Sequence, residues 1–191
     1  MRLILSSRDF RGEASRACIL RNLPRPIAEC RVLFIPNEKA TAESIASGRY
    51  HSRLAEFGFS REKVTVYDPA RAGEFFGLAV DVIYVSGGNT FATLERVRRE
   101  GFDRELVRLI RAGTTYIGGS AGAHLVTQSV EHLREIDENR VGLTVFCGLG
   151  LLNGVLICHY CAGRAALRDR LQSEGRTVYT LTDEESLCLI E

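Results

Sequence analysis

The sequence reads TYIGGSAGAHL at residues 115–125. A short apolar run ends in two glycines, and small residues then lead into a helical pattern that continues to residue 133. A strand that turns directly into a helix is the building unit of α/β folds. We therefore expect a strand over 115–118, a sharp turn around Ser120 and a helix over 123–133.

The same alternation of strand and helix extends along the chain in both directions. Several strand patterns, such as VLFI and VIYV, are apolar throughout, which is typical of strands covered on both faces. The predicted fold class is α/β with three layers, a mainly parallel sheet with helices on both faces, in one domain over 1–191. The other strand patterns lie at 3–5, 32–36, 64–67, 82–86, 155–159, 178–181 and 187–190, and the other helical patterns at 42–57, 90–100, 102–112 and 165–174.

Composition narrows the function classes. The 191 residues include 25 basic and 24 acidic ones, so we expect no nucleic-acid partner, because that would require a large basic surface. No apolar run approaches the roughly 20 residues that cross a bilayer, so we expect no membrane partner. The N-terminus resembles a first strand more than a secretory signal, which predicts a cytoplasmic protein with six free cysteines.

Chemistry is expected beyond the carboxyl ends of the strands, where open α/β sheets bind ligands. Gly118, Ser120 and Gly122 form G-x-S-x-G between a strand and a helix, the context in which this motif presents a nucleophile. The following helix N-terminus favours negative charge, and the amide of Ala121 is a natural oxyanion donor. The alternative is a tight glycine turn that holds a chance serine.

A serine hydroxyl requires a base before it can act as a nucleophile. Of the four histidines, His159 ends a strand pattern at the carboxyl edge, where the site should lie, and we expect it to be the base. His124 is the rival, because it lies four residues after Ser120 on the same helix face. His51 and His132 lie in a helical and an irregular segment, respectively.

A third group usually orients the histidine of such a site. Asp183 is the acid nearest to the carboxyl end of the strand at 178–181, and Glu184 follows it. The alternative for this segment is an acidic solvated turn. The chain order of serine, histidine and acid differs from that of α/β-hydrolases, chymotrypsin and subtilisin, so the motif does not indicate an ordinary lipase or esterase.

Three other segments give weaker indications of function. The glycine loop at 87–90 follows a strand and is either a second source of oxyanion donors or a plain turn. Cys158 and Cys161 form C-x-x-C, but zinc requires four ligands and a redox pair opens a helix, so no metal or cofactor is expected. The segment 131–153 is predicted to be a long loop with one short helix, and its role is open.

Four motifs occur in a specific order over residues 80–190. They are GGNTF at 87–91, YIGGSAGA at 116–123, GLGLL followed by HY ending at residue 160, and LTDEESL at 181–187. Together they resemble the peptidase E family, the aspartyl dipeptidases, and their cyanophycinase relatives. The resemblance implies a class I glutamine amidotransferase-like (flavodoxin-like) fold and a serine hydrolase that cleaves small peptides, such as Asp-X dipeptides, without metal or cofactor.

The resemblance also implies roles for single residues. The family's Ser-His-Glu triad falls on Ser120, His159 and Asp183, where this chain has the shorter acid, and Glu184 is the alternative acid. Because aspartate is one methylene shorter than glutamate, the geometry of this triad is expected to differ from that of the family.

Substrate recognition is implied at further positions. Gly88 and Ala121 would supply the oxyanion amides. Specificity for an N-terminal aspartate stays open, because the family has asparagine where this chain has a histidine, and residues 127–140 do not reproduce its Asn-Asp-rich segment. The residues implied to lie beside the substrate are Asn89, Thr90 and His124.

Two other function classes remain open from the sequence. One is a non-catalytic, amidotransferase-like binding domain that keeps the elbow as a scaffold, since fold does not fix function. The other is an esterase or amidase with a non-peptide substrate. The expected partner is a small peptide substrate, for a monomer or a homodimer.

Overall fold

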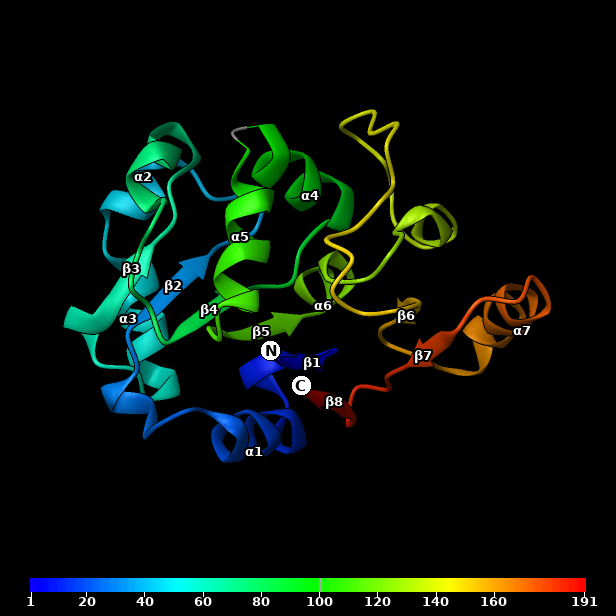
Figure 1. The fold of residues 1–191 in the computed structure, drawn as a ribbon, viewed down its shortest axis with the longest axis horizontal. Coiled ribbons are helices and arrows are strands. Elements are labelled where there is room, and N and C mark those ends of the chain that lie inside the picture. The colour runs from blue at the N-terminus through cyan, green and yellow to red at the C-terminus, as the bar shows by residue number, and fades with distance from the viewer. Residues whose placement is uncertain (100) are drawn as a thin grey trace.

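The structure, a computed structural model, describes residues 1–99 and 101–191. Its main sheet has six strands in the order β3-β2-β4-β5-β1-β8 (Figure 1). Five strands run parallel, and β8 pairs antiparallel with β1 at the edge. The prediction of a mainly parallel sheet is therefore confirmed. The strands are β1 (Arg2–Ser6), β2 (Val32–Ile35), β3 (Val64–Val66), β4 (Val82–Val85), β5 (Thr115–Gly119) and β8 (Ser186–Ile190).

Successive strand residues point into two separate cores. Leu3 and Leu5 of β1 belong to one core, and Ile4 between them belongs to the other. The first core is covered by α4 (Thr90–Arg99), α5 (Phe102–Arg111) and α6 (Ala121–Leu125), and the second by α1 (Glu13–Asn22) and α3 (Arg49–Phe57). The sheet thus has helices on both faces, which explains why its strands are apolar throughout.

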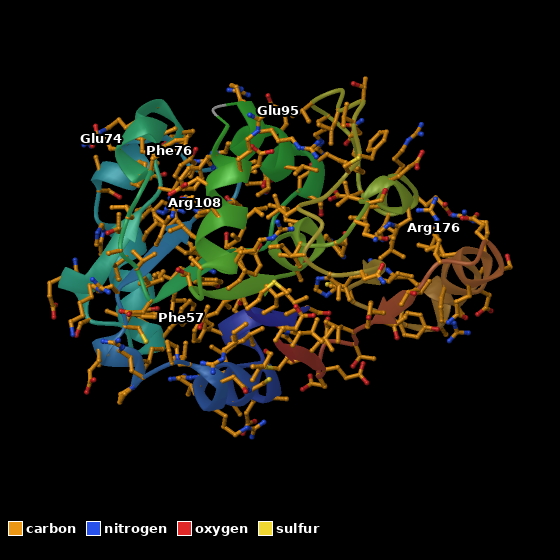
Figure 2. The ribbon with its side chains drawn as sticks, viewed as in Figure 1. Phe57, Glu74, Phe76, Glu95, Arg108 and Arg176 are labelled. Atoms are coloured by element: carbon orange, nitrogen blue, oxygen red, sulfur yellow. The ribbon has the colours of Figure 1, made fainter. Side chains whose placement is uncertain are left out.

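Aromatic side chains fill much of the second core. Phe10 stacks on Phe57, labelled in Figure 2, with ring centroids 4.8 Å apart, and it meets Tyr84 of β4 edge-on. Phe10 lies in the short 3₁₀ segment η1 (Asp9–Arg11), which directly follows β1. This packing fixes the loop that leaves the carboxyl end of β1.

Two helices depart from the predicted pattern. The predicted helix at 42–57 is two helices, α2 (Ala42–Ala46) and α3, because Gly48 adopts a left-handed conformation with φ of 74°. The predicted helix at 123–133 is wrong, since α6 ends at Leu125 and a separate 3₁₀ segment, η5 (Glu131–Glu135), follows. The end of the helix predicted over 90–100 lies outside the described residues. The remaining 3₁₀ segments are η2 (Ile27–Glu29), η3 (Arg61–Lys63), η4 (Pro69–Phe75) and η6 (Ala162–Arg164).

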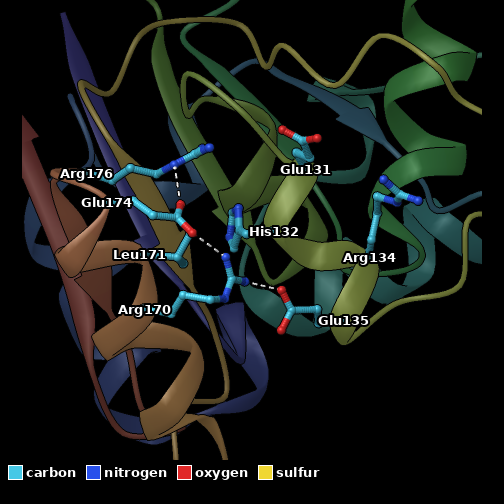
Figure 3. A pocket seen from close by; sticks show the side chains of 8 residues that line it. All are labelled: Glu131, His132, Arg134, Glu135, Arg170, Leu171, Glu174 and Arg176. Atoms are coloured by element: carbon cyan, nitrogen blue, oxygen red, sulfur yellow. Dashed lines mark hydrogen bonds and ion pairs between the residues drawn. The ribbon is translucent and has the colours of Figure 1, made fainter.

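A second, smaller sheet carries the C-terminal part of the predicted site. Its parallel strands, β6 (Val155–Ile157) and β7 (Val178–Thr180), are connected through α7 (Ala165–Ser173), which packs on them through Leu167 and Leu171. An ionic network ties α7 to η5 (Figure 3). In this network Arg170 pairs with Glu135 and, at 2.6 Å, with Glu174.

None of the helices in the described part of the chain has the length and apolar content needed to cross a bilayer.

Candidate active site

Ser120 lies on the sharp turn between β5 and α6. Its backbone has φ of 49° and ψ of −108°, and its N–H donates to the carbonyl of Ser6 at 2.8 Å. Close packing leaves no room for side chains on either side of the turn: a methyl group on Gly118 would collide with the carbonyl of Gly122, and one on Gly122 with the carbonyl of Val85. At the position between Gly118 and Ser120, a methyl group on Gly119 would collide with the side chain of Asp9. The glycines of the motif are therefore required by sterics, as expected for a nucleophile elbow.

His159 follows β6 and approaches Ser120 from the smaller sheet. Its Nε2 atom lies 3.0 Å from Ser120 Oγ, within hydrogen-bond distance. The backbone of His159 also has a positive φ, 51°, and its N–H donates to Ser7 Oγ at 2.9 Å. Ser7 Oγ in turn donates to the carbonyl of Leu181, so one buried hydroxyl joins the ends of β1, β6 and β7.

Asp183 completes a continuous series of hydrogen bonds. Its Oδ1 atom lies 2.6 Å from Nδ1 of His159. The segment is a turn, not an extension of the strand: the backbone of Thr182 accepts from Glu185, and the Glu185 carboxylate accepts from the Thr182 N–H at 2.8 Å. This turn directs Asp183 toward the imidazole, whereas Glu184 makes no such contact.

The arrangement allows a proton to move from a hydroxyl to an imidazole. With Asp183 accepting from Nδ1–H, Nε2 of His159 is the basic nitrogen and faces Ser120. The side chains of His159 and Asp183 are about half exposed, at 41% and 48%, so this side of the site is open to solvent. The three side chains come from two different sheets.

His124, the other candidate base, has no free ring nitrogen to offer Ser120. Its Nε2 accepts from the N–H of Cys158 at 3.2 Å, so its proton lies on Nδ1, which donates to Thr90 Oγ1 at 3.2 Å. Burial, with smaller contributions from His132 and His159, lowers the pKa of His124 to about 3. Both ring nitrogens are thus used inside the protein, and the ring stays neutral.

The polar groups of Asn89 and Thr90 are also engaged inside the protein. Asn89 caps α4, because its Oδ1 accepts from the N–H of Ala92 at 2.9 Å, and its Nδ2 donates to Asp137 at 2.8 Å. Thr90 is buried, and its N–H donates to Asp137 at 3.0 Å. The structure therefore gives each of Asn89, Thr90 and His124 hydrogen-bond partners within the protein, and their expected place beside the substrate stays a prediction.

The two expected oxyanion amides lie at the ends of strands β4 and β5. In the part of the chain that the structure describes, no protein acceptor takes up the N–H of Gly88 or Ala121. The carboxylate of Glu38 packs against Gly88 and accepts from the N–H of Asn89 at 3.0 Å. The glycine loop is thus held from one side by Glu38 and from the other by Asp137.

Sequence reasoning did not identify several of these supporting residues. Ser7 and Asp9 follow a strand at its carboxyl end, and that position was the one available signal for them. Asp137 lies in the irregular segment, where spacing gives no register. Its contact with α4 supplies a structural role for the loop over 131–153.

Other reactive groups lie outside the triad. Burial raises the pKa of the Cys158 thiol to about 12, and Cys161 is exposed. Among the residues that the structure describes, no three His, Cys, Asp or Glu side chains gather as a metal site. A cavity of about 470 Å³ lies between η5 and α7, but its charged lining does not include any residue of the triad (Figure 3).

Comparison with known proteins places this geometry in a family. The model of peptidase family S51 matches residues 3–191. The chain belongs to peptidase family S51. Curated relatives include the uncharacterized peptidase Lmo0363 of Listeria monocytogenes, 38% identical over 82 residues, and peptidase E of Streptomyces coelicolor, 32% identical over 105 residues. The matches cover 42% and 54% of this S51 chain, but only 40% and 41% of those relatives, so the aligned part spans about two fifths of their length.

Solved structures match over almost the whole S51 chain. A candidate peptidase E protein from Listeria monocytogenes EGD-e superposes with a TM-score of 0.76 at 25% identity, covering 98% of this chain and 93% of the other. A peptidase from an acI-B1 Actinobacterium gives a TM-score of 0.62 at 15% identity, covering 98% and 82%. The family resemblance and the class I glutamine amidotransferase-like fold expected from the motifs are confirmed.

Proposed function

We propose that this S51 protein is a serine peptidase that cleaves short peptides, with Ser120 as nucleophile, His159 as base and Asp183 as the orienting acid. The observation that carries the proposal is the unbroken series Ser120 Oγ, His159 and Asp183, with contacts of 3.0 and 2.6 Å. Family membership supports the reaction class, and the contacts support the assignment of each residue.

The first half of the reaction forms an acyl-enzyme. Ser120 Oγ attacks the carbonyl carbon of the scissile peptide bond while His159 Nε2 takes its proton. The negative charge that develops on the carbonyl oxygen is stabilised by the N–H groups of Gly88 and Ala121. When the tetrahedral intermediate collapses, the C–N bond breaks and the protonated His159 gives its proton to the leaving amine.

The second half restores the enzyme. Water attacks the acyl carbon, and His159 takes a proton from that water. The C–O bond to Ser120 then breaks, the proton returns to Ser120 Oγ, and the carboxylic acid product leaves. Throughout, Asp183 holds Nδ1–H of His159 and stabilises the imidazolium, so that Nε2 stays directed at the reacting atoms.

A fluorophosphonate probe combined with a substrate screen tests the proposal. The probe should label Ser120 in the native protein and leave a Ser120→Ala variant unlabelled. Turnover of dipeptides, including Asp-X, would support a peptidase, while turnover of simple esters alone would indicate the esterase alternative. A folded protein whose Ser120 does not react with the probe would be a non-catalytic binding domain, and the proposal would be wrong.

A further inference from the structure

The glycine loop brings the proposed oxyanion amide of Gly88 close to Ser120. A methyl group placed on Gly87 would lie 3.2 Å from Ser120 Cβ, so the peptide bond between Gly87 and Gly88 lies beside this serine. Gly88 is exposed, and no acceptor in the described part of the chain takes its N–H. Donors of this kind stabilise a developing charge only when they are already fixed in place before the reaction. The contacts that fix the loop therefore bear on the rate of the proposed reaction.

The segment that follows strand β2 packs against this loop. A methyl group on Gly88 would collide with the carboxylate of Glu38 and with Cβ of Asn37. Oε2 of Glu38 also accepts from the N–H of Asn89 at 3.0 Å, so the same side chain encloses Gly88 and holds the next peptide N–H. A displacement of residues 37 and 38 would therefore leave Gly88 free to turn its N–H away from Ser120.

A buried arginine holds this segment in turn. Arg96 lies on α4 and is only 8% exposed. Its Nη1 donates to the carbonyl of Asn37 at 2.7 Å and to that of Pro36 at 3.3 Å. These two residues connect the end of β2 to Glu38. Its Nη2 is buried without an acceptor among the described residues. Burying a charged group in this way is costly, so packing alone does not explain an arginine at this position.

We propose that Arg96 is a positioning residue of the proposed peptidase, which acts through residues 36–38 to keep the N–H of Gly88 directed at the oxyanion. The inference rests on the proposed function and adds to it a residue that lies outside the triad. Since α4 directly follows the glycine loop, the contacts form a closed ring, which runs from the loop along α4 to Arg96 and returns to the loop through Asn37 and Glu38. Loss of one contact opens this ring, so each loss should have the same effect on the amide.

Opening the ring should slow the reaction more than it weakens substrate binding. The oxyanion exists only after Ser120 has attacked, so a misdirected donor weakens the transition state and leaves the bound ground state nearly unaffected. Arg96→Met keeps an apolar stem but removes both donated hydrogen bonds. For a dipeptide such as Asp-Leu, kcat should fall by about ten- to hundred-fold, while KM changes by less than about twofold. This loss is smaller than the roughly 10²- to 10³-fold loss that removal of an oxyanion donor causes.

Glu38 and the conservative substitutions separate positioning from a general loss of structure. Glu38→Ala should lower kcat as Arg96→Met does, whereas Glu38→Gln retains an oxygen that accepts from the Asn89 N–H and should recover most of the loss. Arg96→Lys retains the charge and a donor for at least one carbonyl, so its kcat should lie between those of the native protein and Arg96→Met. In the double variant of Arg96→Met and Glu38→Ala, kcat should fall no further than in the less active single variant, because both residues act through the same contacts.

The rate of labelling gives a readout that does not depend on the choice of peptide. The phosphoryl oxygen of a fluorophosphonate takes the place of the oxyanion when Ser120 reacts, so the second-order labelling rate should fall in the same variants by a similar factor. Arg111→Met is the matched control, since it removes the same charge from an exposed position at the end of α5, on the side of the sheet where β5 begins. It should leave kcat and the labelling rate unchanged. Circular dichroism and thermal unfolding check that each variant is folded.

The proposal is overturned if folded Arg96→Met keeps the native kcat and labelling rate, or if the losses of the two single variants multiply in the double variant. If Arg96→Met cannot be purified, Glu38→Ala decides: native rates in that variant remove the step through which Arg96 acts, and reduced rates that Glu38→Gln recovers support it. The proposed function fails by a different result, a native protein that is not labelled at Ser120 and turns over no peptide. The positioning role then falls with it, whereas an active native protein beside an equally active Arg96→Met disproves the positioning role alone.

Discussion

At the scale of single residues, two members of the proposed triad have strained backbone conformations. Ser120 and His159 are non-glycine residues with φ of 49° and 51°. Such conformations persist only where the surroundings hold them, and they cluster at functional sites. Here the holding contacts come from the end of one strand, because Ser6 accepts from the N–H of Ser120 and Ser7 from the N–H of His159. The end of β1 therefore aligns Ser120 and His159, the proposed nucleophile and base, with each other.

Ser120 and His159 should behave as a unit. Ser120→Ala or His159→Ala alone should lower kcat by about 10⁴- to 10⁶-fold, and the double variant should lower it no further, because each loss already abolishes the same step. Peptide hydrolysis by the three purified variants measures this, with circular dichroism as the control for folding. Multiplicative losses in the double variant would mean that the two residues act independently.

Ser7 should affect both catalysis and stability. Ser7→Ala removes the acceptor of the His159 N–H and the donor to Leu181, which leaves a partly buried N–H and a buried carbonyl without a partner. We expect unfolding free energy to fall by about 1–3 kcal/mol and kcat to fall with it, because the imidazole loses its anchor. Thermal unfolding and peptide hydrolysis check this, with the exposed Ser47→Ala as the matched control. An unchanged kcat would show that His159 is positioned by other contacts.

At the scale of elements, the sequence predicted strands better than helices. Every strand pattern corresponds to an observed strand, because a buried strand is an unbroken apolar run that can be recognised locally. Helix α1 was not predicted, since EASRACILRN mixes small, polar and apolar residues without a clear apolar face. The helix expected over 123–133 ends early because Ser129 bridges to Cys147 and Thr127 to Leu152, pairings over long separations that no local pattern contains.

The candidate site shows the same difference between features that are local in the sequence and contacts between distant segments. The closeness of Ser120 and His159 could be expected from the sequence, because a G-x-S-x-G motif and a strand end are local features. The separation of β6 and β7 from the main sheet, and the contacts that Asp9, Arg96 and Asp137 make around the site, depend on how distant segments pack. Such contacts are set by tertiary structure, so they could not be predicted from the spacing of residues.

Asp137 should connect the loop over 131–153 to the glycine loop. Asp137→Ala removes the carboxylate that accepts from Asn89 and from the N–H of Thr90 at the start of α4. We expect unfolding free energy to fall by about 1–2 kcal/mol, as for loss of a helix cap, and kcat to fall because Gly88 is less firmly held. Chemical denaturation and peptide hydrolysis measure the two effects.

The neighbouring Glu138 supplies the matched control for Asp137. Its side chain is exposed and pairs only with the exposed Arg140 among the described ion pairs. Glu138→Ala should therefore change stability by no more than about 0.5 kcal/mol. If the two substitutions lower the stability equally, the loop contributes only its negative charge, and Asp137 does not anchor the start of α4 specifically.

At the scale of the whole molecule, the site exists only while two sheets stay together. Ser120 belongs to the six-stranded sheet, and His159 and Asp183 follow the strands of the smaller one. Two buried histidines lie where these parts meet: His124 of α6 accepts from the backbone of Cys158, and His132 of η5 donates to Leu156 at 2.8 Å. Their rings lie 6.4 Å apart. Protonation of either ring would place a charge between the two sheets.

Stability should therefore fall as the solution becomes acidic. Burial lowers the pKa of both His124, to about 3, and His132, so the folded protein keeps them neutral while the unfolded chain binds protons below about pH 6.5. The stabilisation is fully present above that pH and is lost as the pH falls toward the folded pKa, with a slope of up to about 1.4 kcal/mol per pH unit for each ring. Urea denaturation of the native protein and of His124→Asn between pH 7 and pH 4 measures the slope. Other titrating groups are common to both proteins, so the variant should show a shallower slope, and identical slopes would contradict the prediction.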